Sequence, residues 1–165
     1  MDPYYSLVKY HYTHSVGDTT RLFETILSLS RETSLELALE CLERCVTEKR
    51  LAWLDANLAR LERTASPLLD GYRLFYQVYL GISAPADGAI VEQDERCMVM
   101  RWWNPCPTLA ACQKLGLDTR QVCRLAYHRP VQAFLSRIDP RLRFERNYAA
   151  LRPYTPYCEE VIRLV

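Results

Sequence analysis

The first part of the chain places apolar residues three and four positions apart, which is the spacing of one buried helix face. A first stripe runs over 22–29, directly behind capping residues at 18–20. A second runs over 35–46 behind Thr33 and Glu36, which match a T-x-x-E capping box. Both stripes predict amphipathic helices.

Two further stripes extend this helical region. An apolar stripe over 51–61 ends before Ser66-Pro67, because proline ends or starts a helix. An aromatic-rich stripe then covers 68–80, and Gly81 follows it as a helix stop. Residues 1–83 are therefore expected to be mainly helical.

The remaining part, 84–165, changes character. Residues 89–93 and 96–103 read as two strands joined around Asp94-Glu95. Because alternate strand residues share a face, one face of the second strand carries Met98, Met100 and Trp102. Helices are also expected at 107–115, 118–127 and 130–137, and strands at 141–149 and 157–165.

This order of elements predicts an α+β fold. We expect a single domain over 1–165, in which N-terminal helices pack on a C-terminal, mostly antiparallel sheet with short interleaved helices. The strand-and-helix part, 84–165, carries most of the cysteines.

Composition narrows the class of protein. The 165 residues are 49% hydrophobic and 25% charged, as in ordinary globular proteins, which excludes a disordered chain. No run approaches the roughly 20 apolar residues of a membrane span, and a net charge of +1 argues against nucleic acid as a partner. The first residues lack the basic and apolar regions of a signal peptide, so we expect a cytoplasmic protein with reduced cysteines.

Arginine is concentrated near the C-terminus. From Arg120 to Arg152 there are eight arginines against two acids, Asp139 and Glu145. The guanidinium fork matches carboxylate and phosphate, so this cluster could hold a small anionic molecule. The alternative is a solvated basic face.

Cys106 has the most functional position among the seven cysteines. It precedes Pro107 at the expected start of a helix, where unpaired backbone N–H groups favour an anionic, reactive sulfur. The alternative is a buried cysteine chosen for its size. Packing is the simpler explanation for Cys41, Cys45 and Cys97.

A metal site is left open by the other cysteines. Zinc or an iron–sulfur cluster could bind at Cys106, Cys112, Cys123 and Cys158. Their spacing contains no C-x2-C knuckle, and Cys112 is expected to point into the core, so we expect no four-cysteine site. The cofactor is therefore unknown.

His128 lies five positions after Cys123. A turn before Pro130 could bring the two together as a nucleophile and base. A histidine held at a helix C-terminus by the helix dipole is the commoner explanation.

The stretch 96–162 resembles the L-2-amino-thiazoline-4-carboxylic acid hydrolase family, and its element order is similar to the small-molecule-binding domain related to vinyl reductases. The residues that carry the resemblance are Asn104-Pro105-Cys106-Pro107, Lys114-Leu115-Gly116, Cys123, the strand Arg141–Arg146 and Cys158. The resemblance implies a pocket near Cys106, Cys123 and Cys158 and a hydrolase of non-peptide C–N bonds, which opens a cyclic amidine-like ring with water. Relatives carry a glycine and an acid before the last cysteine, whereas this chain has Pro153 and Pro156 and no acid there.

Two functions follow as expectations. The first is a small-molecule hydrolase that opens an anionic nitrogen- or sulfur-containing heterocycle. Cys106 would be its nucleophile or polarising group, with Cys123 and Cys158 beside it and a base from a distant acid such as Glu145. The candidate substrate-binding residues are Arg146, Arg124, His128, Trp102 and Tyr127.

The alternative function is a non-catalytic domain that binds a small ligand or senses redox state or metal. Its pocket would have aromatic walls formed by Trp102, Trp103 and Tyr127. The N-terminal helical stripes also leave open a homodimer.

Overall fold

The computed structural model describes residues 2–165, which fold into two compact units. Unit 1 consists of the described residues up to Glu48 together with Cys106–Pro130, and unit 2 consists of Lys49–Pro105 and Val131–Val165. The α+β prediction is confirmed, since helices dominate the first half and an antiparallel sheet forms in the second. The expectation of one domain over 1–165 stays a prediction. Across the described residues, no helix is both long and apolar enough to cross a bilayer.

Unit 1 is helical. Its elements are α1 (Pro3–His14), α2 (Thr19–Ser30), the first part of α3 (Leu35–Asn57), α5 (Pro107–Leu115), α6 (Thr119–Val122), the π-helical turn η3 (Cys123–Tyr127) and the start of α7 (His128–Ile138). The buried faces of these helices form one core around Phe23, Leu39 and Leu42. Cys41, Cys45 and Cys112 lie in this core, which confirms their packing role.

Three local expectations need correction. Helix α1 was not predicted, although Asp2 caps it by accepting from the Tyr4 N–H and proline follows at the first helical position. The cap of α3 is Ser34 and not Thr33, because the Leu37 N–H donates to Ser34 Oγ at 3.1 Å. The stripes at 35–46 and 51–61 belong largely to one helix, α3.

His128 also lies elsewhere than expected. No turn precedes Pro130, so the helix runs without a break from Thr119 to Ile138 and His128 is not at a helix C-terminus. Pro130 lacks the N–H that would bond to the carbonyl of Ala126. The wider π-helical turn η3 contains Ala126 and ends three positions before Pro130, which is where such a missing bond is accommodated.

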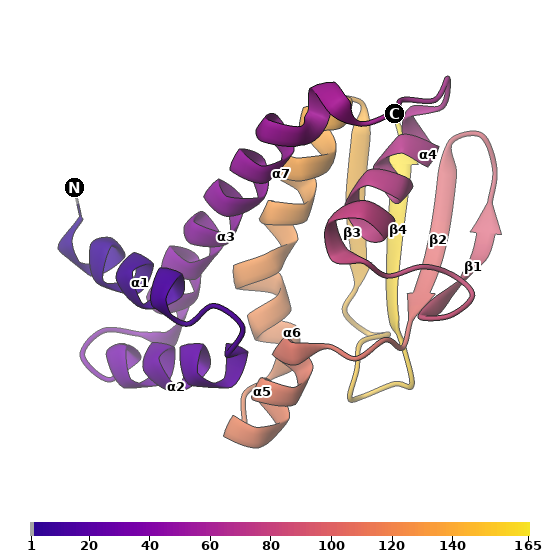
Figure 1. Ribbon diagram of the computed structural model, residues 1–165. Coiled ribbons are helices and arrows are strands. Elements are labelled where there is room, and N and C mark those ends of the chain that lie inside the picture. The colour runs from indigo at the N-terminus through magenta and orange to yellow at the C-terminus, as the bar shows by residue number, and fades with distance from the viewer. Residues whose placement is uncertain (1) are drawn as a thin grey trace. The chain divides into compact units, whose positions relative to one another are not determined.

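Unit 2 contains the sheet. Its further elements are the short 3-10 helix η1 (Leu58–Arg60), α4 (Pro67–Tyr72), the π-helix η2 (Arg73–Leu80), β1 (Gly88–Gln93), β2 (Cys97–Trp102), β3 (Leu142–Asn147) and β4 (Cys158–Leu164). The strands pair antiparallel in the order β1-β2-β4-β3, and Figure 1 shows them side by side with α4 along one face. As predicted, Gly81 ends η2 in the left-handed conformation, with a φ of 70°.

One face of this sheet forms the core of unit 2. Met98, Met100 and Trp102 share a face, as their alternation predicted, and the structure shows that this face is the buried one. They pack with the aromatic residues of η2 and with the apolar face of α7 from Val131 onward. The other face carries long charged side chains, such as Arg101 paired with Glu159.

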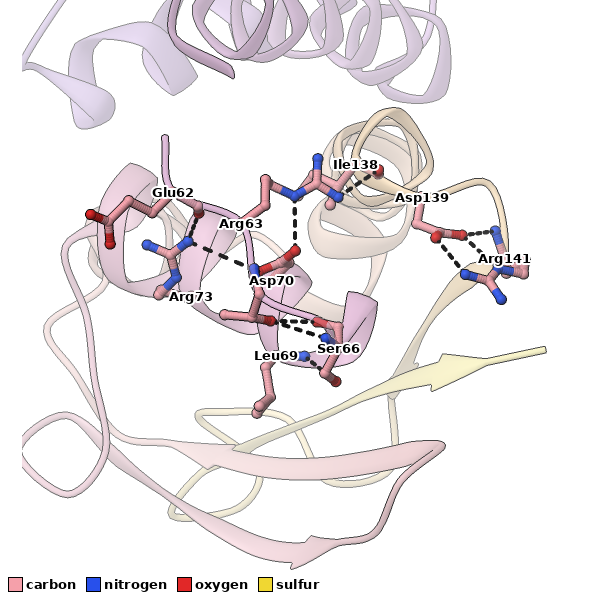
Figure 2. Close-up of polar contacts among 10 residues, drawn as sticks. Glu62, Arg63, Ser66, Leu69, Asp70, Arg73, Ile138, Asp139 and Arg141 are labelled. Atoms are coloured by element: carbon pink, nitrogen blue, oxygen red, sulfur yellow. Dashed lines mark hydrogen bonds and ion pairs between the residues drawn. The ribbon is translucent and has the colours of Figure 1, made fainter. Parts of the chain in front are cut away.

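A buried carboxylate fixes the start of α4. Asp70 is 1% exposed and accepts from Arg63 Nε at 2.8 Å and from the Thr64 N–H at 2.9 Å. Figure 2 shows Arg63 and Arg73 directed at Asp70, while Arg63 also donates to the Ile138 carbonyl at 3.2 Å. Burial alone would raise the pKa of Asp70, but the hydrogen bonds from Arg63 and Thr64 outweigh it and lower the pKa.

Replacing Asp70 by asparagine should destabilise the protein by about 2 kcal/mol at pH 7, because the Arg63 guanidinium and the Thr64 N–H lose a buried anion as their acceptor. A carboxyl whose folded pKa is depressed contributes stability above its unfolded pKa, near 3.9, and loses it as pH falls through the folded pKa. The difference between D70N and wild type in urea unfolding should therefore shrink below about pH 4. The exposed pair of Asp55 with Arg137 supplies the control, since D55N should change stability by less than about 1 kcal/mol. An equal loss in both variants would contradict the burial argument.

Candidate functional site

The structure divides the predicted site residues between the two units. Trp102, Arg146 and Cys158 belong to unit 2. The others belong to unit 1, and they are Cys106, Cys123, Arg124, Tyr127 and His128.

The strand register gathers the unit 2 residues on one face of the sheet. Trp102 pairs with Cys158 across β2 and β4, and Arg146 pairs with Glu160 across β3 and β4. Paired residues point to the same side, and residues two apart on one strand share a face. Trp102, Cys158, Glu160 and Arg146 therefore all lie on the core face, near the end where β4 begins. We call these four residues, together with Tyr76 and Arg152, the sheet-end site.

Glu160 is the centre of this site. Its Oε1 accepts from Arg146 Nε at 2.8 Å and from Arg146 Nη2 at 2.5 Å. Its Oε2 accepts from the Tyr76 hydroxyl at 2.8 Å. Both side chains of the ion pair are only 9% exposed, so this pair is strong in a low-dielectric setting and breaking it would be costly. Both carboxylate oxygens are engaged, which makes Glu160 a poor general base.

Burial and charge act together on Tyr76. The side chain is fully buried, and burial together with the Glu160 carboxylate raises its pKa well above the usual value for a phenol. The phenol therefore stays protonated near neutral pH and remains a donor to Glu160. Two guanidiniums, those of Arg146 and Arg50, oppose this rise in pKa.

Trp102 is held in place by rings and by a glycine. The Tyr76 ring stacks on it with centroids 4.9 Å apart, and the Tyr72 ring lies 6.4 Å away and nearly parallel. Gly88 pairs with Trp102 across β1 and β2, and a Cβ there would lie 2.5 Å from the indole Cε3. Only glycine leaves room for the indole at this position.

A guanidinium contacts the thiol of the same site. Arg152 Nε donates to Cys158 Sγ at 3.4 Å, and Arg152 Nη1 donates to the Asn104 carbonyl at 2.7 Å. Cys158 and Arg152 are both partly exposed. Within residues 2–165, Arg152 forms no ion pair with a carboxylate. A positive charge at hydrogen-bonding distance stabilises a thiolate or another anion.

Unit 1 confirms the N-cap prediction for Cys106. Its Sγ accepts from the Leu109 N–H at 3.5 Å, and the helix that it caps ends at Gly116. Cys123, Tyr127 and His128 are partly buried on one helical run, and Arg124 is exposed. Their roles in substrate binding or catalysis stay predictions.

The four cysteines considered as metal ligands belong to different units, because Cys158 lies in unit 2 and Cys106, Cys112 and Cys123 lie in unit 1. Over the described chain, no three histidine, cysteine, aspartate or glutamate side chains come close enough to share a metal ion. Cys112 is fully buried, and desolvation raises its pKa to about 11, which favours the neutral thiol over the thiolate that metals bind.

The arginine cluster at 120–152 is distributed over both units and largely serves internal contacts. Arg129 pairs with Glu43, Arg137 with Asp55 and Arg141 with Asp139. The expected base Glu145 lies on the opposite sheet face from Arg146, where it pairs with Arg163 at 3.1 Å.

Sequence reasoning missed Tyr76, Glu160 and Arg152. Tyr76 belongs to the aromatic stripe at 68–80, which predicts burial but not a charged partner. Glu160 and its neighbour Glu159 both fall in the predicted strand 157–165, and alternation separates their faces without showing which face is buried. Arg152 lies outside the regular elements, so no periodic signal identified it.

Removing the Tyr76 hydroxyl tests the buried network. Y76F should lower the free energy of unfolding by about 2 kcal/mol, because Glu160 loses a charge-assisted hydrogen bond in a buried place. Urea denaturation at pH 7 measures this change. Y72F is the matched control, since the Tyr72 hydroxyl only accepts from the Ala84 N–H at 3.3 Å, and its loss should amount to about 1 kcal/mol or less. A larger loss in Y72F than in Y76F would refute this account of the network.

Alkylation should separate the cysteines into two groups. Iodoacetamide at pH 7.5 should modify the partly exposed Cys106, Cys123 and Cys158 first. The four buried thiols should react last, because burial raises their pKa, to about 11 for Cys45 and Cys112. The slow group is Cys41, Cys45, Cys97 and Cys112. Peptide mass spectrometry over a time course measures the order, and early modification of Cys112 would contradict it.

Comparison with protein-family models, with curated proteins and with solved structures returns no match to this chain. The resemblance to the amino-thiazoline hydrolases therefore stays a prediction, and the case for function depends on the geometry of the sheet-end site.

Proposed function

We propose that this chain is a small-molecule hydrolase-like protein in which the sheet-end site binds an anionic nitrogen- or sulfur-containing heterocycle. The observation that carries the proposal is the guanidinium of Arg152 on the Cys158 thiol, 3.4 Å away and without a carboxylate partner among residues 2–165. A cysteine attacks as its thiolate, and Arg152 places a charged hydrogen-bond donor directly on this sulfur. It also supplies a cation for the charge of an anionic ligand.

Cys158 is a better candidate for the nucleophile than Cys106. The Cys106 sulfur accepts from a backbone N–H at 3.5 Å, whereas a charged donor contacts the Cys158 sulfur. Charged donors stabilise an anion more than neutral ones do. Cys158 also shares its sheet face with Trp102, which can form one wall of a binding site for a flat ring.

The chemistry follows from a thiolate beside a cyclic amidine. The Cys158 sulfur adds across the C=N bond of the amidine carbon, and that carbon then releases the ring sulfur, which takes up a proton as a thiol. Water adds to the same carbon, and the Cys158 sulfur departs as thiolate. The carbon retains both nitrogens and gains oxygen from water, so the product of 2-amino-thiazoline-4-carboxylate is N-carbamoyl cysteine.

One observation favours a second function, a non-catalytic domain for a small anionic ligand. Both oxygens of Glu160 are occupied by Arg146 and Tyr76, so the site offers no carboxylate as general base. In this alternative, Arg152 and Trp102 bind the ligand and Cys158 stays unmodified.

Turnover of 2-amino-thiazoline-4-carboxylate distinguishes the two functions. Wild type should release N-carbamoyl cysteine, detected by liquid chromatography and mass spectrometry, and C158S should lose about 100-fold or more in rate. C97S is the matched control, because Arg163 Nη1 likewise donates to Cys97 Sγ, at 3.2 Å, but Arg163 also pairs with Glu145. C97S should keep wild-type activity within about twofold.

The outcomes separate the proposals. Equal losses in C158S and C97S would overturn the assignment of Cys158. Saturable thermal stabilisation of wild type by the probe without product would overturn the hydrolase and support the ligand-binding domain. In either function R152Q should weaken binding, because it removes the cation.

A further inference from the structure

A buried hydrogen-bond donor in the sheet-end site has no acceptor. Trp102 is 3% exposed, and its Nε1 is buried without a hydrogen-bond partner in the described part of the chain. An unpaired buried N–H lowers stability, and native proteins contain few of them. The retention of an unpaired donor inside this core therefore calls for a physical explanation.

The indole cannot easily turn to find an acceptor. Tyr76 stacks on it, Tyr72 lies parallel to it, and Gly88 approaches it so closely that no Cβ would fit. Repacking such a contact requires off-rotamer side chains and backbone shifts. The unpaired N–H thus belongs to a fixed ring and not to a mobile surface group.

The position of the ring connects this donor with the proposed ligand. Trp102 is the cross-strand partner of Cys158, and the Cys158 thiol accepts from Arg152. Arg152 in turn donates to the carbonyl of Asn104, two residues after Trp102. The indole and the guanidinium therefore both adjoin the position of Cys158, one on β2 and the other from the segment before β4.

Arg73 Nε is also buried without a partner, but its setting differs. The same guanidinium donates through Nη2 to the Glu62 carbonyl and lies 3.9 Å from Asp70. The contacts of Arg73 around the buried carboxylate of Asp70 thus account for its position. Trp102 has a single donor, and that donor is the unpaired one.

We propose that the indole N–H of Trp102 recognises a ligand, donating to an acceptor atom on the ring of a small anionic molecule whose charge Arg152 binds. The inference rests on the proposed function for its class of ligand. It adds a basis for selectivity: a ring that carries a nitrogen or sulfur acceptor pairs with the N–H, and a plain hydrocarbon ring leaves it unpaired. Sites built to hydrogen-bond a ligand discriminate against analogues that lack the group.

Replacing Trp102 by 3-benzothienylalanine tests this role, because sulfur replaces the N–H while the size and shape of the ring are kept. Loss of an unpaired buried donor should leave the ligand-free protein as stable as wild type or more stable. Binding of 2-amino-thiazoline-4-carboxylate should weaken about tenfold, and binding of cyclopentanecarboxylate should not change. Wild type should prefer the heterocycle, and the variant should lose that preference. Trp53, whose ring packs on Tyr79 and Phe134, is the control, and the same replacement there should leave the preference for the heterocycle unchanged.

Calorimetry and thermal unfolding on the full chain give the outcomes. A Trp102 variant that is more stable than wild type and binds both probes equally well would overturn the inference. The unpaired N–H would then lower stability without contributing to binding. If wild type binds 2-amino-thiazoline-4-carboxylate without forming product, the hydrolase is overturned. The inference is still supported in that case if the Trp102 variant loses the preference for the heterocycle. Wild type that binds neither probe would overturn the inference together with the binding step of the proposed function.

Discussion

Glu160 places a carboxylate inside the apolar layer between the sheet and the helices of unit 2, and its neighbours are arranged to make that placement tolerable. Arg146 supplies the charge from the adjacent strand, and Tyr76 supplies a hydroxyl from η2. Desolvation of such an ion is expensive, so the pair stabilises the fold only when its hydrogen bonds are complete. The register of β4 between β2 and β3 is therefore tied to this contact. A slip of one residue would turn Glu160 away from the core and bring Glu159 into it.

Unit 2 has a second buried carboxylate, Asp70, and the contrast between the two is informative. Asp70 is bound by residues near it in sequence, Arg63 and Thr64, and so organises a local turn. The partners of Glu160 lie 14 and 84 positions away, so its network forms only when strand and helix have come together. Asp70 therefore fixes the local structure at the start of α4, whereas Glu160 fixes the alignment of β4 with β3 and η2. Arg152 differs from the arginines that bind these two carboxylates, since its described contacts are the Cys158 thiol and the Asn104 carbonyl.

The proposed ligand site shares residues with the stable core of unit 2. Trp102 and Tyr76 stack within the apolar core, yet Trp102 keeps an unpaired donor and Cys158 keeps a partly exposed sulfur. Functional sites often retain unsatisfied groups that cost stability. The packing against Gly88 and Tyr72 fixes the indole in position at that cost.

Local pattern was sufficient for most elements of this protein. Apolar spacing located the helices from α2 through η2, alternation placed Met98, Met100 and Trp102 on one face of β2, and Cys106 caps α5 as its place before proline predicted. These features depend on neighbours within a few residues, so the sequence alone determined them. The tertiary structure alone decided that Glu160 and not Glu145 is the buried acid, and that Arg146 is its partner. It also brought Arg152 to the thiol of Cys158. The physical reason is that alternation separates the two faces of a strand, whereas burial, register and charge pairing depend on strands and helices distant in sequence.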